Sequence, residues 1–368
     1  MVKIAIFGDD MKKIFRKIAY FLIKNKKITK SDLVQEEFKT VCFFSNTAIG
    51  DTLFNTPVFR AFKQNLPNVK TIALLNPKNY KLFENNPYID EVVLYAGRWK
   101  KFFNVANILK KKNIDIVFIL HSNEPQATPL AVLSNAKYIY KLHNDKNEFR
   151  NFHSNTPKPL EVEDYVVKYR LKYLEFVGIK SSDTRMELFL DKKDYDEVDR
   201  VFKKKSNLKY IGFQMGASTL SRQWFLEKWV ELAKLFLNDE NIRIVLTGSL
   251  SDKKLTTQLV NSLNSERILD FAGVFSIRGA AALIDRLDLL ITPDTGPLHI
   301  AAALKTPTVT LFVVAQPYAS NPNFDKEIHK IIKKEKTCVP CVGRRCKYQK
   351  CMLQISAREV YELSKELI

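Results

Sequence analysis

The chain has 368 residues, 46% of them hydrophobic and 27% charged, so it can bury the cores of about two soluble domains. Lysine and arginine outnumber aspartate and glutamate by 59 to 40, and the net charge of +19 favours an anionic partner: nucleic acid, an anionic membrane surface or a phosphorylated substrate. No run reaches the roughly 18 apolar residues of a membrane-spanning helix, and lysines interrupt the N-terminal apolar stretches, which argues against a signal peptide. We therefore expect a cytoplasmic protein.

Residues 1–39 precede the first domain as a basic extension. Val2 to Phe7 are predicted to form a strand, and Met11 to Lys30 an amphipathic helix. The apolar residues that share one face of this helix are Ile14, Phe15, Ile18, Phe21 and Leu22. Lysines and an arginine occupy the other side, and no acidic residue lies between Met11 and Ser31. Such a helix can lie on an anionic inner leaflet, or it can pack on the protein and leave its lysines in water.

The first domain is expected over residues 40–180. Apolar runs predict strands over 40–45, 71–75, 91–95, 114–120 and 135–140, and helical signals appear over 52–65, 80–84, 100–112 and 165–177. This alternation favours a parallel sheet covered by helices. The loop after the first strand contains Asn46, Thr47, Gly50 and Asp51, at the edge where open α/β sheets place functional groups. Asp51 can be a functional carboxylate there, or it can cap a helix that begins at Thr52.

The second domain is expected over residues 181–355, and a polar segment, residues 179–207, is expected to form the crossing between the two domains. Strands are predicted over 209–213, 242–247, 267–270, 287–291 and 307–312, and helices over 225–237, 252–263, 276–284 and 300–304. A last helix within 356–368 is expected to pack back across the domains. The fold class is therefore α/β, with two Rossmann-like, doubly wound parallel-sheet domains that face a central cleft.

Polar residues gather in the turn that follows the predicted strand 287–291. Asp294, Thr295 and Gly296 form this turn, Pro297 suits the first helical position, and His299 lies in the first turn of the helix. The free N–H groups of that first turn make an anion site of a size suited to phosphate. The turn predicts a phosphorylated ligand, such as a nucleotide or a nucleotide-sugar; the alternative is a well-capped turn without a ligand.

A second phosphate-binding loop is predicted directly after strand 209–213. Its small residues, among them Ser218 and Thr219, allow close approach of the backbone to a phosphate, and Arg222 can neutralise a diphosphate. The alternative is an exposed Arg222 in front of a core tryptophan, Trp224. No Gly-x-Gly-x-x-Gly motif occurs in the chain, which argues against a nicotinamide or flavin enzyme.

Four of the five cysteines lie close together near the C-terminus, as Cys338, Cys341, Cys346 and Cys351. Four thiolates at this spacing could surround a structural zinc or iron ion. The spacing departs from a standard pair of Cys-x-x-Cys knuckles, so free thiols and a structural disulfide stay open.

These motifs resemble the heptosyltransferase family, glycosyltransferase family nine. The resemblance rests on Asp294-Thr295-Gly296 with His299 three residues later, on Gly50-Asp51 near the amino terminus, and on the segment 86–92. It covers about residues 40–367 and implies a GT-B fold and an inverting, metal-independent transfer that requires no cofactor. The implied donor is ADP-heptose, and the implied acceptor is a lipid-linked, phosphorylated inner core of lipopolysaccharide or a related surface glycan. An enzyme of this kind is expected on the inner face of the cytoplasmic membrane.

The resemblance also implies roles for individual residues. Asp51 would act as the general base on the acceptor hydroxyl, with Asn46, Thr47 and Gly50 in the acceptor-side loop. The donor-binding residues would be Ser218, Thr219, Arg222, Ser251, Asp252, Phe275, Asp294, Thr295, Gly296 and His299, of which Ser251 and Asp252 would lie near the ribose or base and the Phe275 loop near the adenine.

Two further hypotheses remain at this point. The same fold could use another nucleotide-sugar, or the chain could be a non-catalytic basic protein that binds nucleic acid or a membrane; of the two, nucleic acid is the less expected partner. Asp194-Tyr195-Asp196 matches the metal-binding Asp-x-Asp of other glycosyltransferases. Because no apolar strand precedes it, we interpret it as the solvated start of a helix.

Overall fold

A computed structural model describes residues 2–97, 99–122, 125–142, 148–156, 164–313, 316–338 and 340–368, and of residues 2–12 and 344 only the backbone. The chain forms two compact units. The first comprises residues 1–163 and 167–183, and the second comprises residues 184–368 together with 164–166. Within the described residues, no helix combines the length and the apolar character needed to cross a membrane.

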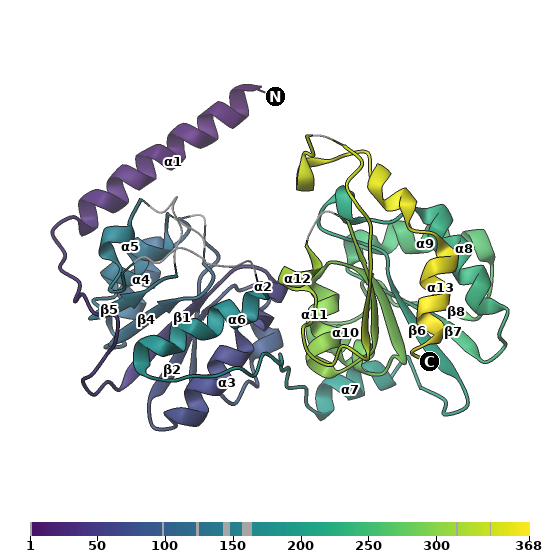
Figure 1. Cartoon of the computed structure of the whole chain (residues 1–368), viewed down its shortest axis with the longest axis horizontal. Coiled ribbons are helices and arrows are strands. Elements are labelled where there is room, and N and C mark those ends of the chain that lie inside the picture. Colours follow the sequence, from purple (N-terminus) through teal and green to yellow (C-terminus); the bar gives the residue numbers. More distant parts are fainter. Residues whose placement is uncertain are drawn as a thin grey trace. The chain divides into compact units, whose positions relative to one another are not determined.

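The first unit is built on a parallel five-stranded sheet with the order β3-β2-β1-β4-β5 (Figure 1). Its strands are β1 Thr40–Ser45, β2 Lys70–Leu75, β3 Glu91–Leu94, β4 Ile116–Ile119 and β5 Tyr138–Tyr140. Every residue of β1 and β4 is buried, because helices cover both faces of a parallel sheet and leave its central strands no solvated side. The apolar runs of the sequence predicted all five strands.

The helices of this unit are α1 Val2–Ile23, α2 Ile49–Leu53, α3 Thr56–Asn65, α4 Phe102–Lys110, α5 Ala127–Leu133 and α6 Val166–Leu171. The strand predicted over Val2 to Phe7 is wrong, since these residues begin α1. The single helix predicted over 52–65 is also wrong. It is divided because Pro57 has no N–H to donate and lies at the start of α3, where that loss costs nothing.

The helix α1 is fixed to the first unit along one of its sides. Ala19 and Ile23 are fully buried in the core that also contains α4 and α5, and α1 packs on α5. The ring of Phe15 stacks on Trp99, with 5.2 Å between the ring centroids. The spacing of four residues between Phe15, Ala19 and Ile23 places them on one side of the helix, which is therefore the side that faces the protein.

The second unit is built on a parallel six-stranded sheet with the order β11-β10-β9-β6-β7-β8. Its strands are β6 Lys209–Gln214, β7 Ile242–Thr247, β8 Ile268–Asp270, β9 Leu289–Pro293, β10 Thr308–Phe312 and β11 His329–Lys333. The edge strand β11 was not predicted, because its sequence His-Lys-Ile-Ile-Lys has neither a continuous apolar run nor a regular alternation.

The helices of the second unit are α7 Lys192–Asp199, α8 Leu226–Leu237, α9 Lys253–Leu263, α10 Ile277–Asp285, α11 Gly296–Leu304, α12 Pro317–Ser320 and α13 Ala357–Lys365. The last helix was expected to pack back across the domains. In the structure, α13 packs mainly on α8 and β10 of the second unit, and Ala357 and Val360 are fully buried in that core.

The Asp-x-Asp segment lies near the start of α7, where Asp196 is exposed as expected but Asp194 is not. Asp191 caps this helix, and Asp194 is only 3% exposed. The Asp194 carboxylate accepts hydrogen bonds from the buried Arg278 of α10, at 2.8 Å from Nε. The Arg278 guanidinium binds the Asp194 carboxylate and so connects α10 to α7. The expectation of solvent exposure was therefore wrong for Asp194.

Candidate functional site

The topology of the first sheet determines where a ligand can bind. The chain runs from β1 outward to β2 and β3, then crosses back to β4 on the other side of β1. The loops that follow β1 and β4 therefore separate at their carboxyl ends, and this switch point is where open α/β sheets bind ligands. The segment after β1 carries Asn46 and Thr47 in its loop and Asp51 in the short helix α2, and the loop after β4 carries His121.

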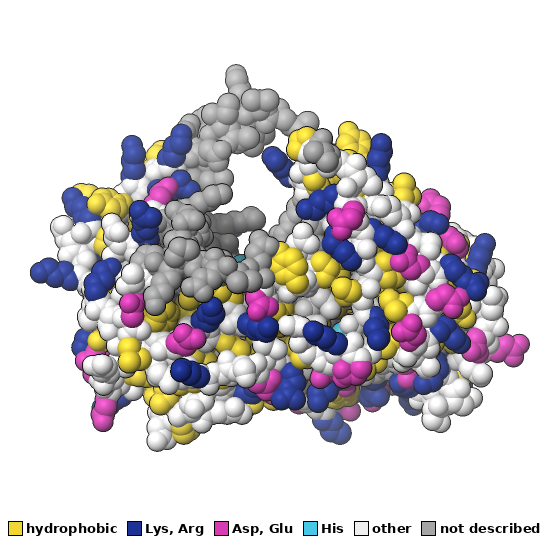
Figure 2. Space-filling view, viewed as in Figure 1, with side chains coloured by type: hydrophobic (Ala, Val, Ile, Leu, Met, Phe, Trp, Pro, Cys, Tyr) yellow, Lys and Arg dark blue, Asp and Glu magenta, His cyan; other side chains and the backbone are white. Residues whose placement is uncertain are grey.

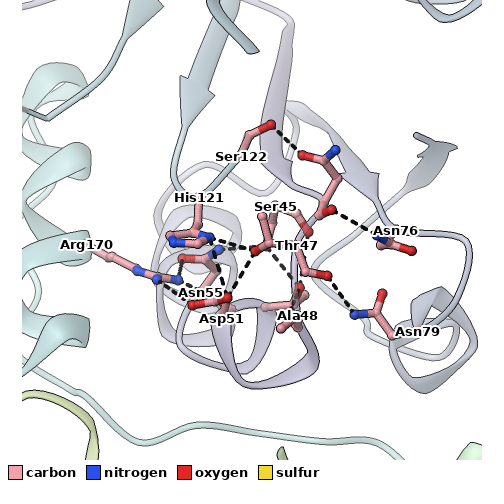
Figure 3. A network of polar contacts seen from close by, with 12 residues as sticks. Ser45, Thr47, Ala48, Asp51, Asn55, Asn76, Asn79, His121, Ser122 and Arg170 are labelled. Atoms are coloured by element: carbon pink, nitrogen blue, oxygen red, sulfur yellow. Dashed lines mark hydrogen bonds and ion pairs between the residues drawn. The ribbon is translucent and has the colours of Figure 1, made fainter. Parts of the chain in front are cut away.

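Asp51 lies at this switch point with its side chain 30% exposed (Figure 3). Its Oδ1 is 3.6 Å from Nη2 of Arg170, and its Oδ2 accepts a hydrogen bond from Thr47 Oγ1 at 3.3 Å. Asp51 belongs to the short helix α2, whose N-cap is Ala48 and has no side-chain cap. The capping alternative is therefore wrong, and the carboxylate faces polar partners at the sheet edge.

Arg170 of α6 contacts Asp51 from the buried side of the segment after β1. Its side chain is 5% exposed, and its Nη1 donates to the backbone carbonyl of Asp51 and, at 2.7 Å, to Oδ1 of Asn55. Asn55 in turn donates to Ser45 Oγ at 2.7 Å. The buried guanidinium thus fixes both the backbone and the carboxylate of Asp51, while the carboxylate keeps a solvent-facing side.

His121 completes this group, and sequence reasoning missed it. Its Nδ1 lies 2.6 Å from Thr47 Oγ1 and 3.6 Å from Asp51 Oδ2 (Figure 3). Loss of hydration lowers the pKa of His121 to about 4, and Arg170 and Lys141 act in the same direction, although Asp51 opposes them. The imidazole is therefore neutral at neutral pH. Its sequence signal is its place directly after the predicted strand 114–120; Arg170 has no comparable signal.

The remaining predicted residues of this loop are structural neighbours of Asp51. Asn46 is fully buried and donates to the carbonyl of Tyr95 at 3.1 Å, which ties the loop after β1 to the loop after β3. Gly50 is buried within α2. Thr47 bridges Asp51 and His121 through its hydroxyl group.

The second sheet has its own switch point between β6 and β9. Arg222, after β6, and Asp294, after β9, meet across it: Nη2 lies 3.3 Å from Asp294 Oδ2, and Nη1 donates to the Asp294 carbonyl at 2.9 Å. Both side chains are largely buried, at 13% and 9% exposed. The alternative of an exposed Arg222 is therefore wrong, and a guanidinium lies at the carboxyl edge of this sheet.

The helix α11 begins at this edge, as the turn motif predicts. Thr295 is its N-cap residue, but the Thr295 hydroxyl contacts Thr292 Oγ1 at 3.1 Å and does not cap the helix. Gly296 is the first helical residue, Pro297 follows it, and His299 is buried in the helix. An anion at this N-terminus would thus meet amides that no side chain caps.

Three of the other predicted donor residues lie on neighbouring loops of the same edge. Asp252 accepts hydrogen bonds from Ser249 N and Oγ, both at 2.8 Å, and Ser251 Oγ contacts Ser249 Oγ at 2.7 Å. A Cβ on Gly216 would lie 2.1 Å from Asp252 Oδ1, so the Asp252 carboxylate takes this position because residue 216 has no side chain. Phe275, after β8, packs on Phe271 at 5.5 Å.

Ser218 and Thr219 lie in the loop after β6 beside Arg222, Ser218 exposed and Thr219 half-buried. Thr219 Oγ1 lies 3.2 Å from Ser221 Oγ, and this is the contact that holds its side chain. The two hydroxyl groups therefore remain near the surface of the predicted phosphate loop.

The four clustered cysteines do not converge on one point. All are free thiols, and the described residues contain no group of three or more His, Cys, Asp or Glu side chains that could hold a metal ion. Cys351 accepts from the Thr337 amide at 3.2 Å, whereas Cys341 accepts from Gly343 at 3.3 Å. The expectation of a zinc or iron site therefore has no preformed ligand set in the described part of the chain.

Comparison with known proteins gives concordant matches. The model of glycosyltransferase family 9 (heptosyltransferase) matches residues 146–352, more than half of the chain. Lipopolysaccharide heptosyltransferase 3 of Escherichia coli K12 is 29% identical over 278 residues, which are 72% of this chain and 79% of the relative.

Two solved structures share the fold over nearly the whole length. A family 9 glycosyltransferase from Veillonella parvula has a TM-score of 0.77 at 20% identity and covers 92% of this chain and 99% of its own. The Escherichia coli ADP-heptose lipopolysaccharide heptosyltransferase II has a TM-score of 0.73 at 20% identity, with 90% and 98% covered. Their similarity shows the GT-B type of fold, with two Rossmann-like domains.

Proposed function

Because the chain belongs to glycosyltransferase family 9, the heptosyltransferase family, we propose that it transfers a heptose from ADP-heptose to the inner core of a lipopolysaccharide or a related surface glycan. The names of its relatives, a lipopolysaccharide heptosyltransferase and an ADP-heptose lipopolysaccharide heptosyltransferase, support this donor and this acceptor class. The reaction is proposed to invert the anomeric centre and to need no metal.

The observation that carries the proposal is the position of Asp51. A sugar hydroxyl is a weak nucleophile until a base removes its proton as the new glycosidic bond forms. Asp51 has a partly exposed carboxylate at the ligand-binding edge of the first sheet, and Arg170 and Thr47 hold it in place. We assign it the role of this base. Attack on the face of the sugar opposite to the departing ADP gives inversion in a single displacement.

The departing ADP is proposed to bind at the switch point of the second sheet. Negative charge grows on the diphosphate as the bond to the sugar breaks, and positioned amides and a guanidinium stabilise such charge. The N-terminus of α11 at Gly296 and the guanidinium of Arg222 are the groups we assign to it. Ser218, Thr219, Ser251, Asp252 and Phe275 are proposed to line the rest of the nucleotide site.

Transfer is tested with a deacylated, phosphorylated inner-core oligosaccharide, so that no membrane is required. The protein is incubated with ADP-heptose or with matched UDP-, GDP- and ADP-hexoses, with and without excess EDTA, and the acceptor mass is followed. We expect the mass of one heptose to be added from ADP-heptose alone, at the same rate in EDTA. If transfer occurred only from one of the hexose donors, the proposed donor would be wrong and that nucleotide-sugar would take its place. If no nucleotide-sugar supported transfer, the proposal itself would be contradicted.

A further inference from the structure

The outer side of α1 presents apolar side chains to solvent. Ile14, Ile18 and Phe21 are 52%, 43% and 68% exposed, and their spacing of four and three residues aligns them along one side of the helix. Leu22 extends this stripe. Ala19 and Ile23, which hold the helix on the protein, lie on a different side, so the stripe is not the face that packs on the core.

Basic side chains border this apolar stripe. Lys17, Lys24 and Lys27 are exposed, and the Lys24 ammonium lies 4.4 Å from the centroid of the Phe21 ring. Residues 11–30 include no aspartate or glutamate. Figure 2 shows hydrophobic and basic side chains next to each other on the first unit, in the region where Figure 1 shows the C-terminal end of α1. Arg16 pairs with Glu148 at 3.0 Å, whereas the three lysines beside the stripe are exposed, so the surface combines apolar area with positive charge.

The helix α4 adds a second exposed aromatic ring with lysines around it. Phe103 is 62% exposed, and Lys100 and Lys101 precede it in exposed positions. Its neighbour Phe102 packs on Trp99 at 4.9 Å, and Trp99 stacks on Phe15 of α1. This row of rings connects α1 to α4, so the stripe and Phe103 lie on neighbouring helices of the first unit.

We infer that this surface binds the face of a bilayer that contains anionic phospholipids. Apolar side chains of a helix with a basic border enter the boundary between headgroups and acyl chains, while the lysines pair with anionic headgroups. Three of the four residues of the stripe, Ile14, Ile18 and Leu22, are aliphatic and offer no flat ring on which a nucleic-acid base could stack. A second copy of the chain would bring the same lysines against one another, so charge complementarity favours lipid.

The surface adjoins the edge of the first sheet that carries Asp51. Trp99 lies in the loop after β3, and the same loop is tied to Asn46 through the carbonyl of Tyr95. This part of the inference rests on the proposed function: a lipid-linked acceptor held in the bilayer would be delivered to the carboxyl edge of the first sheet. Binding to lipid itself does not depend on it.

Vesicle flotation of the full chain tests the inference, with vesicles of phosphatidylethanolamine and phosphatidylglycerol compared with vesicles of phosphatidylcholine. The test variant is Ile18→Ser with Phe21→Ser, and the control is Val201→Ser with Leu353→Ser, two apolar residues of the second unit that are 58% and 53% exposed. Partition of the test variant into anionic vesicles should fall at least about tenfold, since burial of one large apolar side chain changes an equilibrium constant by that amount or more. The control variant should bind like the unmodified protein.

Transfer assays separate this inference from the proposed function. The Ile18→Ser, Phe21→Ser variant should retain full activity on the deacylated acceptor and lose activity on the same acceptor presented in vesicles. Equal flotation of test variant and unmodified protein would overturn the inference, as would equal binding to phosphatidylcholine. The inference would also be overturned if the unmodified protein formed a dimer without lipid and the test variant were monomeric. The surface would then bind a second copy of the chain.

Discussion

Asp51 depends on residues that are far from it in the sequence. Arg170, which donates to its backbone carbonyl, is 119 positions away, and His121 approaches it from the loop of another strand. The three side chains meet because β1 and β4 are neighbours in the sheet and Arg170 of α6 reaches the backbone carbonyl of Asp51. At the scale of single residues, the candidate base is therefore a product of topology, and changes to its neighbours should alter its function.

His121 is predicted to position Asp51 through Thr47. Replacement by Ala removes the 2.6 Å contact to Thr47 Oγ1 and lets both side chains turn, so kcat should fall about tenfold or more while the KM for the donor changes little. His121→Asn keeps a polar group near Thr47 and should restore part of the rate. Steady-state kinetics with varied donor measures both parameters.

The pH profile distinguishes this role from direct proton transfer by His121. With its pKa lowered to about 4, the imidazole is already neutral at pH 5.5 and above, so the unmodified enzyme should show no step near pH 6.5. A step near pH 6.5 that disappears in His121→Ala would assign the proton transfer to His121 and contradict the positioning role.

Arg222 is predicted to stabilise the leaving diphosphate. Arg222→Met should lower kcat/KM about 10- to 100-fold and weaken binding of ADP, because a charge-assisted hydrogen bond at that site is lost. Arg222→Lys should recover part of the affinity, since the charge remains and the forked geometry does not. Arg200→Met, at an exposed position of the same unit, is the matched control. Unchanged ADP binding by titration calorimetry in Arg222→Met would refute the assignment.

At the scale of secondary-structure elements, one buried ion pair connects two helices of the second unit. Asp194 of α7 and Arg278 of α10 have side chains that are 4% and 6% exposed, and the guanidinium also donates to the carbonyl of Phe189 at 3.0 Å. An ion pair this deeply buried costs desolvation, but loss of one partner leaves the other charged and unpaired. The pair thus determines how α7 lies against α10.

Arg278→Leu should destabilise the second unit by about 3–5 kcal/mol, because Asp194 stays buried without its partner. Arg358→Leu is the matched control: its ion pair with Glu362 is 2.7 Å long and largely exposed, and its loss should cost less than about 1 kcal/mol. Urea unfolding followed by circular dichroism gives both values. Similar costs for the two substitutions would show that burial does not decide the contribution of the pair.

At the scale of the whole molecule, hydrophobic pattern predicted most of the strands and helices, because parallel strands are buried on both faces and read as continuous apolar runs. The turn from β9 into α11 and the loop from β1 into α2 were located by the same pattern. The burial of Asp194 and the strand β11 were not predicted, since both depend on tertiary contacts. The break between α2 and α3 was also missed, although Pro57 is a local signal for it. Arg170 was missed because no local signal shows which distant side chain a loop will contact. His121 was missed although it directly follows the predicted strand 114–120.

Each unit contains a buried neutral histidine that should make its stability depend on pH. Burial lowers the pKa of His153 to about 3 and that of His329 to about 4, and each ring contacts a threonine hydroxyl, at 2.9 and 3.0 Å. In the unfolded chain these histidines titrate near 6.5, so between that pH and about 4 the unfolded state binds more protons. Stability is therefore full above pH 6.5 and is lost as the pH falls.

Each histidine should lower the free energy of unfolding of its unit by about 2 kcal/mol at pH 5 relative to pH 7.5. His153→Gln and His329→Gln should unfold with a smaller loss of stability between the two pH values, whatever their stability at pH 7.5. Differential scanning calorimetry of the variants and the unmodified protein checks this difference. An identical acid-induced loss in all three proteins would assign the effect to other groups.

The central claim is that the Asp51 carboxylate removes the proton of the acceptor hydroxyl, and single-turnover transfer with Asp51→Asn tests it most directly. Asn preserves the size of the side chain and its contact with Thr47 but cannot accept a proton at neutral pH. The account predicts a transfer rate at least about a hundredfold lower, with ADP-heptose still bound at near-normal affinity and with full activity in Glu84→Gln, an exposed carboxylate of the same unit. Transfer by Asp51→Asn at the rate of the unmodified enzyme would contradict it.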